Sequence, residues 1–313
     1  MHKKLSVFFI LTTFAFAPCI KGQELDSVVL HTTKLSDTVY LLLPEPGYGG
    51  NIAVLVGEDG ILIVDDMLMP LTNKIRDAIE SIKPGPITYL LNSHYHYDHA
   101  GGNAAFGNTS TIVAHTNVRK RLAEGREAGS QFIEGQRPTE ALPVITFEQQ
   151  MSFYWNGEIV DLIHLDNTSH TDGDSVIFFR DSNVVHTGDQ YVNLNGFPFI
   201  DRDVGGSAIG LRDNIRMLLS MIDHKTQIIP GHGPLANKND LQNYYKIVSD
   251  SIAFIEAHKN TGKSLEEIQD IGLPKQFSEV TGFMPAATWI GFVYPDLPYG
   301  LVRTDHSKAL AIQ

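Results

Sequence analysis

Four potential metal ligands lie within six residues of this chain, directly after a short apolar run. The run Ile87–Leu91 leads into His94-Tyr95-His96-Tyr97-Asp98-His99, and Ala100-Gly101-Gly102 follows. Alternate side chains of an extended segment lie on one side, so His94 and His96 point together, while Asp98 and His99 turn toward a second centre. One ion does not conveniently accept all four groups. The spacing therefore indicates two metal ions, and the fold must bring further ligands to them.

A surface histidine cluster is the alternative interpretation of this motif. The motif lies between apolar segments, however, and Gly101 and Gly102 permit a tight entry into a helix. Imidazole nitrogens and carboxylate oxygens are the ligands that zinc prefers where no thiolate is present. We therefore favour a metal-binding loop at the end of a buried strand.

Three later residues are the candidates for the missing ligands. His170, Asp189 and His232 each follow an apolar run and lie in a loop that contains glycine. In α/β folds, binding and catalytic residues lie mostly in such loops at the ends of strands. Taken singly, a histidine after a strand is more often structural, and a Gly-Asp pair is more often a turn. Their order after the first motif favours a shared site.

This set resembles the metallo-β-lactamase superfamily over about residues 35–235, with His94-x-His96-x-Asp98-His99 as its signature motif. The resemblance implies an α/β fold of the αββα type, a four-layered sandwich with the metals at one edge. It further implies that His94, His96 and His170 hold one zinc ion. Asp98, His99 and His232 would hold the other, and Asp189 would bridge both.

The sequence leaves two questions open, namely the role of Asp65 and the identity of the metal. Asp65 matches an aspartate that supports the ligands in that family, but a solvated acid at a strand end explains it equally well. Zinc is the first choice for a ligand set without sulfur, and iron or manganese is possible. The oxygen-reducing di-iron members of the family carry Glu where this chain has His96, which argues against a redox role.

The mechanism expected from the resemblance uses a hydroxide shared by the two ions. Two divalent cations lower the pKa of a shared water from ~16 toward ~7, and the hydroxide attacks a carbonyl. Asp98 is the candidate catalytic residue, because it can orient the nucleophile or shuttle its proton. The chain has no Gly-x-Ser-x-Gly motif that would supply a serine nucleophile.

The substrate class stays open between several members of the family, because fold does not determine function. Thioesterases and lactonases of the family have Asp at the position of Asp189, whereas the best-known zinc β-lactamases have Cys or Ser. We expect hydrolysis of an ester, thioester, lactone or amide in a small molecule. A β-lactamase is the alternative, and a metal-dependent binding protein without turnover is a third possibility. Candidates for the substrate wall are Tyr191, Asn193, Asn195, Phe197, Phe199, Met67, Leu68 and Met69, although packing of the loops is the better interpretation for most of them.

The N-terminus has the pattern of a secretory signal peptide. Lys3 and Lys4 precede an apolar run from Leu5 to Ala17, which is too short for a permanent membrane span. We expect cleavage after Gly22 and a secreted or periplasmic protein. Pro18 before Cys19 disfavours a lipid anchor. Residues 23–313 are then expected to form one hydrolase domain with a C-terminal helical extension from about residue 238.

The charge of the expected mature chain argues against nucleic acid as a partner. Without residues 1–22 it holds 21 basic and 36 acidic residues, a net charge of about −15. Phosphate binding relies on clustered Lys and Arg, which this chain lacks. The sequence indicates no particular oligomeric state.

Apolar runs and their periodicity predict two β-rich halves, each followed by helices. The strands are expected at 38–43, 52–56, 61–64, 87–91, 111–114, 144–147, 151–155, 158–165, 175–179, 184–187 and 226–229. The helices are expected at 70–82, 209–222, 239–260 and 265–270, with Ser207 as the N-cap of the second, and a short helix within 118–134.

Overall fold

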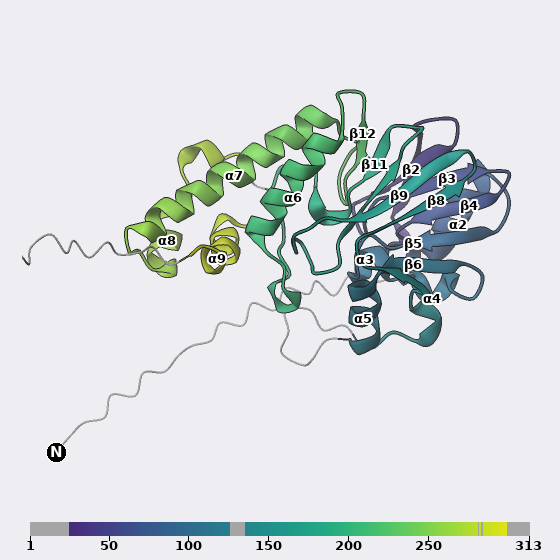
Figure 1. Cartoon of the computed structure of the whole chain (residues 1–313), viewed down its shortest axis with the longest axis horizontal. Coiled ribbons are helices and arrows are strands. Elements are labelled where there is room, and N and C mark those ends of the chain that lie inside the picture. Colours follow the sequence, from purple (N-terminus) through teal and green to yellow (C-terminus); the bar gives the residue numbers. More distant parts are fainter. Residues whose placement is uncertain (1–24, 126–134, 281, 283, 299–313) are drawn as a thin grey trace, which may run out of the picture.

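Two β-sheets lie face to face at the centre of this computed structural model, and helices cover their outer faces (Figure 1). The structure describes residues 25–125, 135–280, 282 and 284–298. The predicted signal peptide, residues 1–22, lies outside the described residues. This arrangement confirms the four-layered αββα architecture expected from the sequence.

The first sheet contains seven strands in the order of the sequence. The strands are β1 (Val29–Lys34), β2 (Val39–Glu45), β3 (Ile52–Gly57), β4 (Gly60–Val64), β5 (Ile87–Leu91), β6 (Thr111–His115) and β7 (Ile145–Phe147). Strands β1 to β4 pair antiparallel, and β4 to β7 pair parallel. The parallel pairs need crossover connections, which helices provide.

The second sheet has five strands in the order β12-β11-β10-β9-β8. The strands are β8 (Gln150–Trp155), β9 (Glu158–His164), β10 (Ser175–Phe179), β11 (Val184–His186) and β12 (Gln227–Ile229). Only β11 and β12 pair parallel. The carboxyl ends of β11 and β12 therefore open at the same edge of the sheet.

Helices form the two outer layers. On the first sheet lie α2 (Thr72–Ile82) and α4 (Asn103–Phe106), with α3 (Tyr97–Ala100) and α5 (Thr116–Glu124) at one edge. On the second sheet lie α6 (Ala208–Met221), α7 (Lys238–Asn260), α8 (Leu265–Ile271) and α9 (Ala286–Asp296). Short 3₁₀ turns occur at Met69–Leu71, Thr139–Ala141, Gly188–Gln190, Arg202–Val204 and Lys275–Phe277.

Three layers of apolar contact hold the sandwich together. Leu62, Leu162 and Ile177 lie between the sheets and are fully buried. Ile75 and Ile79 of α2 pack on the outer face of the first sheet. On the outer face of the second sheet lie Leu211, Ile215 and Leu218 of α6 and Val248 of α7. Burial of large aliphatic side chains stabilises each layer by about 1.5–3 kcal/mol per side chain.

Most element predictions agree with the structure to within two residues. Helix α6 begins after Ser207, whose hydroxyl accepts the Gly210 N–H, so the predicted N-cap is confirmed. The predicted helix at 70–82 begins instead as a 3₁₀ turn at Met69–Leu71, and its α-helical part starts at Thr72. The helix predicted within 118–134 is α5, and residues 126–134 lie outside the described part.

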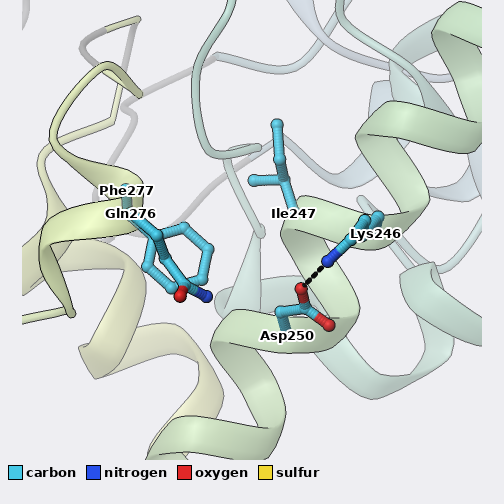
Figure 2. Close-up of a pocket in the computed structure, with 5 residues that line it drawn as sticks. All are labelled: Lys246, Ile247, Asp250, Gln276 and Phe277. Atoms are coloured by element: carbon cyan, nitrogen blue, oxygen red, sulfur yellow. Dashed lines mark hydrogen bonds and ion pairs between the residues drawn. The ribbon is translucent and has the colours of Figure 1, made fainter.

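Helices α7, α8 and α9, residues 238–298, are called the C-terminal helical segment below. Its surface carries a shallow hollow between α7 and the 3₁₀ turn at Lys275–Phe277 (Figure 2). Lys246 and Asp250 form an ion pair at its rim. The hollow contains no cluster of histidines, so it is not the candidate site. No helix among the described residues combines the length and apolar character needed to cross a membrane.

Candidate metal centre

All seven predicted ligands meet at one edge of the sandwich, where strand ends of both sheets converge. His94, His96, Asp98 and His99 follow β5, and His170 lies between β9 and β10. Asp189 follows β11, and His232 follows β12. Their donor atoms fall into three overlapping groups, each with all atoms within 4.8 Å of one another.

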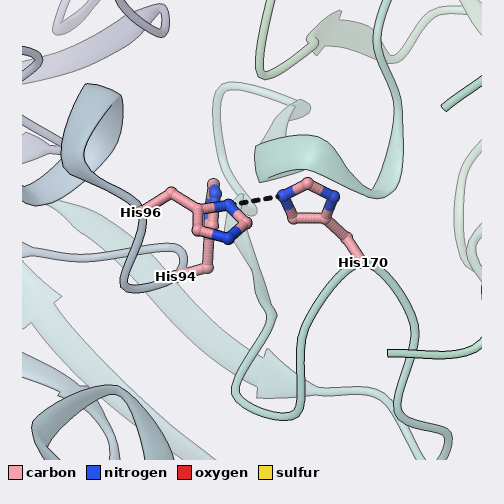
Figure 3. A group of neighbouring side chains, drawn as sticks. All are labelled: His94, His96 and His170. Carbon is pink, nitrogen blue, oxygen red and sulfur yellow. Dashed lines mark hydrogen bonds between the residues drawn. The ribbon is translucent and has the colours of Figure 1, made fainter. Parts of the chain in front are cut away.

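The first group contains His94, His96 and His170 (Figure 3). The His96 Nδ1 atom lies 2.8 Å from the His170 Nε2 atom. The His94 ring lies 4.8 Å from each of the other two rings, nearly perpendicular to both. His94 and His96 therefore do point to the same side, as alternation along an extended segment predicts.

The second group contains Asp98, His99 and His232. The His99 and His232 Nε2 atoms are 3.1 Å apart, and Asp98 Oδ2 lies 3.2 Å from the His232 nitrogen. Asp98 remains partly exposed, with 39% of its side-chain surface accessible, whereas His99 is fully buried. Asp98 is thus the most accessible member of this group, since 16% of the His232 side chain is accessible.

Asp189 connects the two groups through its two oxygens. Its Oδ1 atom lies 3.2 Å from His99 Nε2, and its Oδ2 atom lies 3.5 Å from His170 Nε2. A methyl group at Gly231 would lie 1.9 Å from Asp189 Oδ1, so only glycine leaves room for this carboxylate. This is the geometry that a bridging ligand requires.

The hydrogen bonds of the outer ring nitrogens show that the cluster fits a cation. His170 Nδ1 contacts the Phe199 carbonyl oxygen at 2.8 Å, and His96 Nε2 contacts Asp201 Oδ2 at 2.8 Å. Because these acceptors require N–H donors, the facing nitrogens carry lone pairs when both rings are neutral, which is the state that metal binding requires. Two lone pairs 2.8 Å apart repel each other unless a cation lies between them.

Two further atoms support the same conclusion. Ser93 Oγ donates to Asp65, so His94 Nδ1 must donate to Ser93 Oγ, and His94 Nε2 carries a lone pair. That nitrogen and Asp189 Oδ1 are buried without a hydrogen-bond partner among the described residues. Buried polar atoms are almost always satisfied, so an orphaned pair aimed into one cluster indicates a ligand there.

The two ends of the cluster differ in electrostatics. Burial lowers the pKa of His94 and of His170 below the usual range, so both stay neutral, as ligands must be. Burial alone would lower the pKa of His99, but the carboxylates of Asp189 and Asp98 outweigh it and hold that pKa well above its usual range. The end with the carboxylates therefore attracts positive charge more strongly than the end with three imidazoles.

Asp65 supports the second group from behind. It is fully buried, and its carboxylate accepts the Ser93 N–H at 2.7 Å and contacts His99 Nδ1 at 2.8 Å. The alternative of a solvated acid at a strand end is therefore wrong. Its φ of +65° is uncommon for a residue other than glycine, and such strained positions persist where their surroundings fix them.

Asp201 is a site residue that the sequence did not reveal. It is fully buried, and its Oδ2 atom also accepts a short hydrogen bond from the Tyr95 hydroxyl in addition to its contact with His96 Nε2. A partner 105 residues away has no local sequence signal. The only hint was the polar tip of Tyr95 inside the motif, which needs a partner when buried.

Asn51 is a second such residue, and it holds the loop of His232. Its side-chain amide donates to the carbonyls of Pro230 and Gly233, each at 2.8 Å, and its backbone N–H donates to Gly231. The carbonyl of Asn51 in turn accepts a hydrogen bond from His186. Asn51 thereby holds the residues before His232, Pro230 and Gly231, and the residue after it, Gly233.

The predicted substrate wall is largely a packing layer. Tyr191, Phe197, Met67 and Leu68 are buried, and Phe199 is only 8% exposed. The amides of the two candidate asparagines, Asn193 and Asn195, donate to backbone carbonyls. Met69 remains 45% exposed, and so does Leu194, at 46%, which the sequence had not singled out.

Four other histidines, His115, His164, His186 and His224, have structural or surface positions. His115 and His164 stack on each other with ring centroids 4.1 Å apart. His186 is buried against Asn51, and His224 is exposed. None of these four histidines belongs to a ligand group among the described residues.

Comparison with curated proteins gives two kinds of match. A stretch of 40 residues is 48% identical to an N-acyl homoserine lactonase from Bacillus thuringiensis, covering 13% of this chain and only 16% of the lactonase. A longer stretch of 169 residues is 27% identical to a hydroxyacylglutathione hydrolase from Polaromonas sp., covering 54% of this chain and 57% of that protein. This chain thus aligns with only part of each relative.

Solved structures share the fold at low sequence identity. A metallo-beta-lactamase from Pontibacter korlensis aligns with a TM-score of 0.57 and 16% identity, over 71% of this chain and all of that one. A sec-alkylsulfatase from Pseudomonas sp. aligns with a TM-score of 0.63 and 16% identity, over 85% of this chain and 50% of that one. At such identities these neighbours show the fold alone.

The sequence model of one family covers more than half of the chain. It matches residues 46–234, which include all seven candidate ligands and both sheets from β3 to β12. The sandwich, the ligand cluster at its edge and this match agree. The chain belongs to the metallo-beta-lactamase superfamily.

Proposed function

We propose that this chain is a zinc-dependent hydrolase that cleaves an ester, thioester, lactone or amide bond of a small molecule at a two-metal site. The observation that carries the proposal is the convergence of seven imidazole and carboxylate groups whose lone pairs face one another at one edge of the sandwich. Membership of a superfamily of metal-dependent hydrolases supports the reaction class.

The proposed ligand sets follow the groups described above. His94, His96 and His170 would hold the first ion, Asp98, His99 and His232 would hold the second, and Asp189 lies where it could serve both. Nitrogen and oxygen donors without sulfur suit zinc, and iron and manganese accept the same donors. Metal analysis by mass spectrometry of the protein as isolated distinguishes among the three.

The role proposed for the bound ions is the activation of water and the polarisation of a carbonyl oxygen. Asp98 is the residue proposed to act on the proton. It is partly exposed, and although burial raises its pKa, His99 and His232 outweigh that effect and hold the pKa well below the usual range. An ionised carboxylate at this point can accept a hydrogen bond that orients the nucleophile, and because its low pKa makes it a weak base it would pass a proton on to the leaving group and not retain it.

The substrate classes are ranked by Asp189 and by the sequence relatives. An aspartate rather than a cysteine or serine connects the two ligand groups, and the two curated relatives are named as an N-acyl homoserine lactonase and a hydroxyacylglutathione hydrolase. A β-lactamase is the second candidate, since the export that the N-terminal sequence predicts would fit a role in antibiotic hydrolysis. A binding protein without turnover is the third, and the complete ligand set disfavours it.

We also propose that residues 1–22 direct export to the periplasm or the exterior and are then removed. The mature chain, residues 23–313, would act as one hydrolase domain. The basic start and the apolar run up to Ala17 support this. N-terminal sequencing of the secreted protein tests the cleavage after Gly22, and a retained N-terminus in the cytoplasm would contradict it.

A substrate panel tests the proposed reaction. The zinc-loaded protein is assayed with lactones, thioesters, aryl esters and nitrocefin under the same conditions. We expect turnover of a lactone, thioester or ester to exceed turnover of nitrocefin. Nitrocefin turnover equal to that of the best ester would favour the β-lactamase, and no turnover despite bound metal would favour the binding protein.

His96→Ala tests the connection between metal and activity. We expect it to lower the metal content and the turnover together, because it removes a donor from the first group. His224→Ala is the matched control, since His224 is exposed and outside every ligand group. Full activity with normal metal content in His96→Ala would contradict the assignment.

A further inference from the structure

The C-terminal helical segment lies beyond the part of the chain that the superfamily model matches, which ends at residue 234. We infer that this segment positions the first ligand group, His94, His96 and His170, by holding the loop from Phe197 to Ser207. Asp296 and Phe292 of α9 are the residues through which it acts. The inference rests on the proposed metal centre and is independent of the substrate.

The start of the loop is embedded in the helical segment through Phe197. Its ring stacks on the Trp289 ring at 5.4 Å with an angle of 10°, and it lies 6.1 Å from Phe277. A β-bridge to Met284 fixes its backbone. Phe197 is 2% exposed, so this end of the loop is part of an apolar core that α9 completes.

Phe199 carries the contact from α9 to the imidazoles. On one side its ring lies 5.5 Å from the Phe292 ring, in an edge-to-face arrangement. On the other side it lies 6.0 Å from His96 and 5.8 Å from His170. Its carbonyl oxygen is the acceptor that fixes the tautomer of His170. A shift of Phe199 would therefore move both rings and weaken that hydrogen bond.

Asp296 fastens the other end of the loop. Its carboxylate accepts hydrogen bonds from the Arg202 guanidinium, from Ser207 Oγ at 3.0 Å and from the Ala208 N–H at 2.6 Å. Arg202 also donates to the carbonyl of Phe292 at 3.1 Å. The position of the carboxylate at the first turn of α6 is favourable, because helix N-termini attract negative charge.

Asp201 lies between these two anchors and contacts the ligands directly. Its N–H donates to the His170 carbonyl at 2.9 Å, and its own carbonyl accepts the Gly206 N–H at 2.9 Å. Its Oδ2 atom contacts His96 Nε2. Groups that orient metal-bound histidines change metal affinity by 10–100-fold when they are lost. The loop that supplies both such groups is held from outside by α9.

Asp296→Ala is the variant that tests this positioning role. We expect binding of Co²⁺ at the first ligand group to weaken at least tenfold, while binding at the second group changes less than threefold. Asp296→Asn should fall between wild type and Asp296→Ala, because the amide oxygen can still accept from Ala208 but cannot pair with the Arg202 charge. Titrations followed by visible absorption measure both affinities, and His170→Ala and His232→Ala identify the bands of each group.

Ser264→Ala is the matched control within the same segment. Ser264 caps α8 through reciprocal hydrogen bonds with Glu267, which also belongs to α8, so its loss should leave both affinities unchanged. Phe292→Leu provides a second test should Asp296→Ala fail to fold, and it should also weaken only the first group. Equal affinities in Asp296→Ala and wild type, or an equal weakening of both groups, would overturn the inference. Failure of the wild-type chain to bind Co²⁺ would instead refute the proposed metal centre itself.

Discussion

Gly50 shows how closely the chain is built around a candidate ligand. A methyl group there would lie 2.2 Å from Cε1 of the buried His99 ring, and the Gly50 N–H donates to the Asp98 carbonyl at 2.9 Å. Neither the ring nor the backbone can move without disturbing the second ligand group. The residue is therefore a steric requirement of the site and is not itself a ligand.

We predict that Gly50→Ala removes about one metal equivalent and destabilises the fold by roughly 1–3 kcal/mol, because the added methyl overpacks the site. Gly47→Ala is the matched control in the same loop, since a methyl group there meets no atom within 4 Å. Metal analysis and urea unfolding of both variants test this. Two bound metal ions per chain in Gly50→Ala would show that His99 is not held as described.

For single residues, sequence reasoning found the seven candidate ligands that the fold brings together and suggested Asp65 behind them, but it did not find Asn51 and Asp201. Imidazoles and carboxylates at His94, His96, Asp98 and His99 are recognisable because their spacing is local. Asn51 donates to the backbone carbonyl of Pro230, which is 179 residues away in the sequence. Asp201 contacts the outer ring nitrogen of His96, which is 105 residues away. Only the folded chain brings these partners together.

At the element scale, the junction of β6 and α5 contains a histidine with a structural role. His115 Nδ1 accepts the Asn117 N–H and so caps α5, while its Nε2 contacts the Glu148 carbonyl oxygen. Burial, and then the neighbouring His164, lower the pKa of His115 below its usual value of 6.5, although Glu148 and Asp172 oppose this. The folded chain therefore binds a proton here less readily than the unfolded chain.

The sign of the resulting pH dependence follows from linkage. Above pH 6.5 His115 is neutral in both states, and as the pH falls below this value the unfolded chain gains a proton first, so folding stability is lost. His115→Asn keeps a side-chain cap but cannot titrate. We predict that the metal-free variant loses less stability than wild type between pH 7.5 and 5.5, by less than about 1.4 kcal/mol per pH unit.

Urea unfolding of metal-free wild type and His115→Asn at both pH values measures this difference. His224→Asn, at an exposed position, should behave as wild type does. Parallel losses of stability in wild type and His115→Asn would show that His115 takes up its proton equally well in the folded and unfolded chain.

Sequence reasoning missed the helices whose apolar residues show no helical spacing. Helices α3 and α4 have four residues each, too few to display helical spacing. Helix α9 buries Trp289, Ile290, Phe292 and Val293, which are nearly consecutive, so its apolar residues form no single stripe. The long helices α6 and α7 were predictable because each has one polar face.

At the scale of the whole molecule, the sandwich and the ligand cluster depend on each other. The family resemblance supplied the αββα layers, which the alternation of strands and helices alone would have left among several α/β arrangements. The ligands come from strand ends of both sheets, so an ion bound there would tie the sheets together. Metal removal should therefore lower the stability of the whole sandwich.

We predict that a chelator lowers the melting temperature by roughly 5–10 °C for each site that zinc at 100 times its dissociation constant had filled. The physical reason is mass action, because zinc binds the assembled cluster and not the separated ligands. Differential scanning calorimetry before chelation, after chelation and after return of zinc measures the effect. An unchanged melting temperature across all three samples would contradict it.

We propose that seven side chains from four loops hold a pair of cations. Anomalous X-ray diffraction at the zinc edge, from crystals of the zinc-loaded protein, tests it most directly. We expect two peaks, one about 2.0–2.1 Å from nitrogens of His94, His96 and His170 and one at a similar distance from nitrogens of His99 and His232. A single peak, or peaks remote from these histidines, would contradict it.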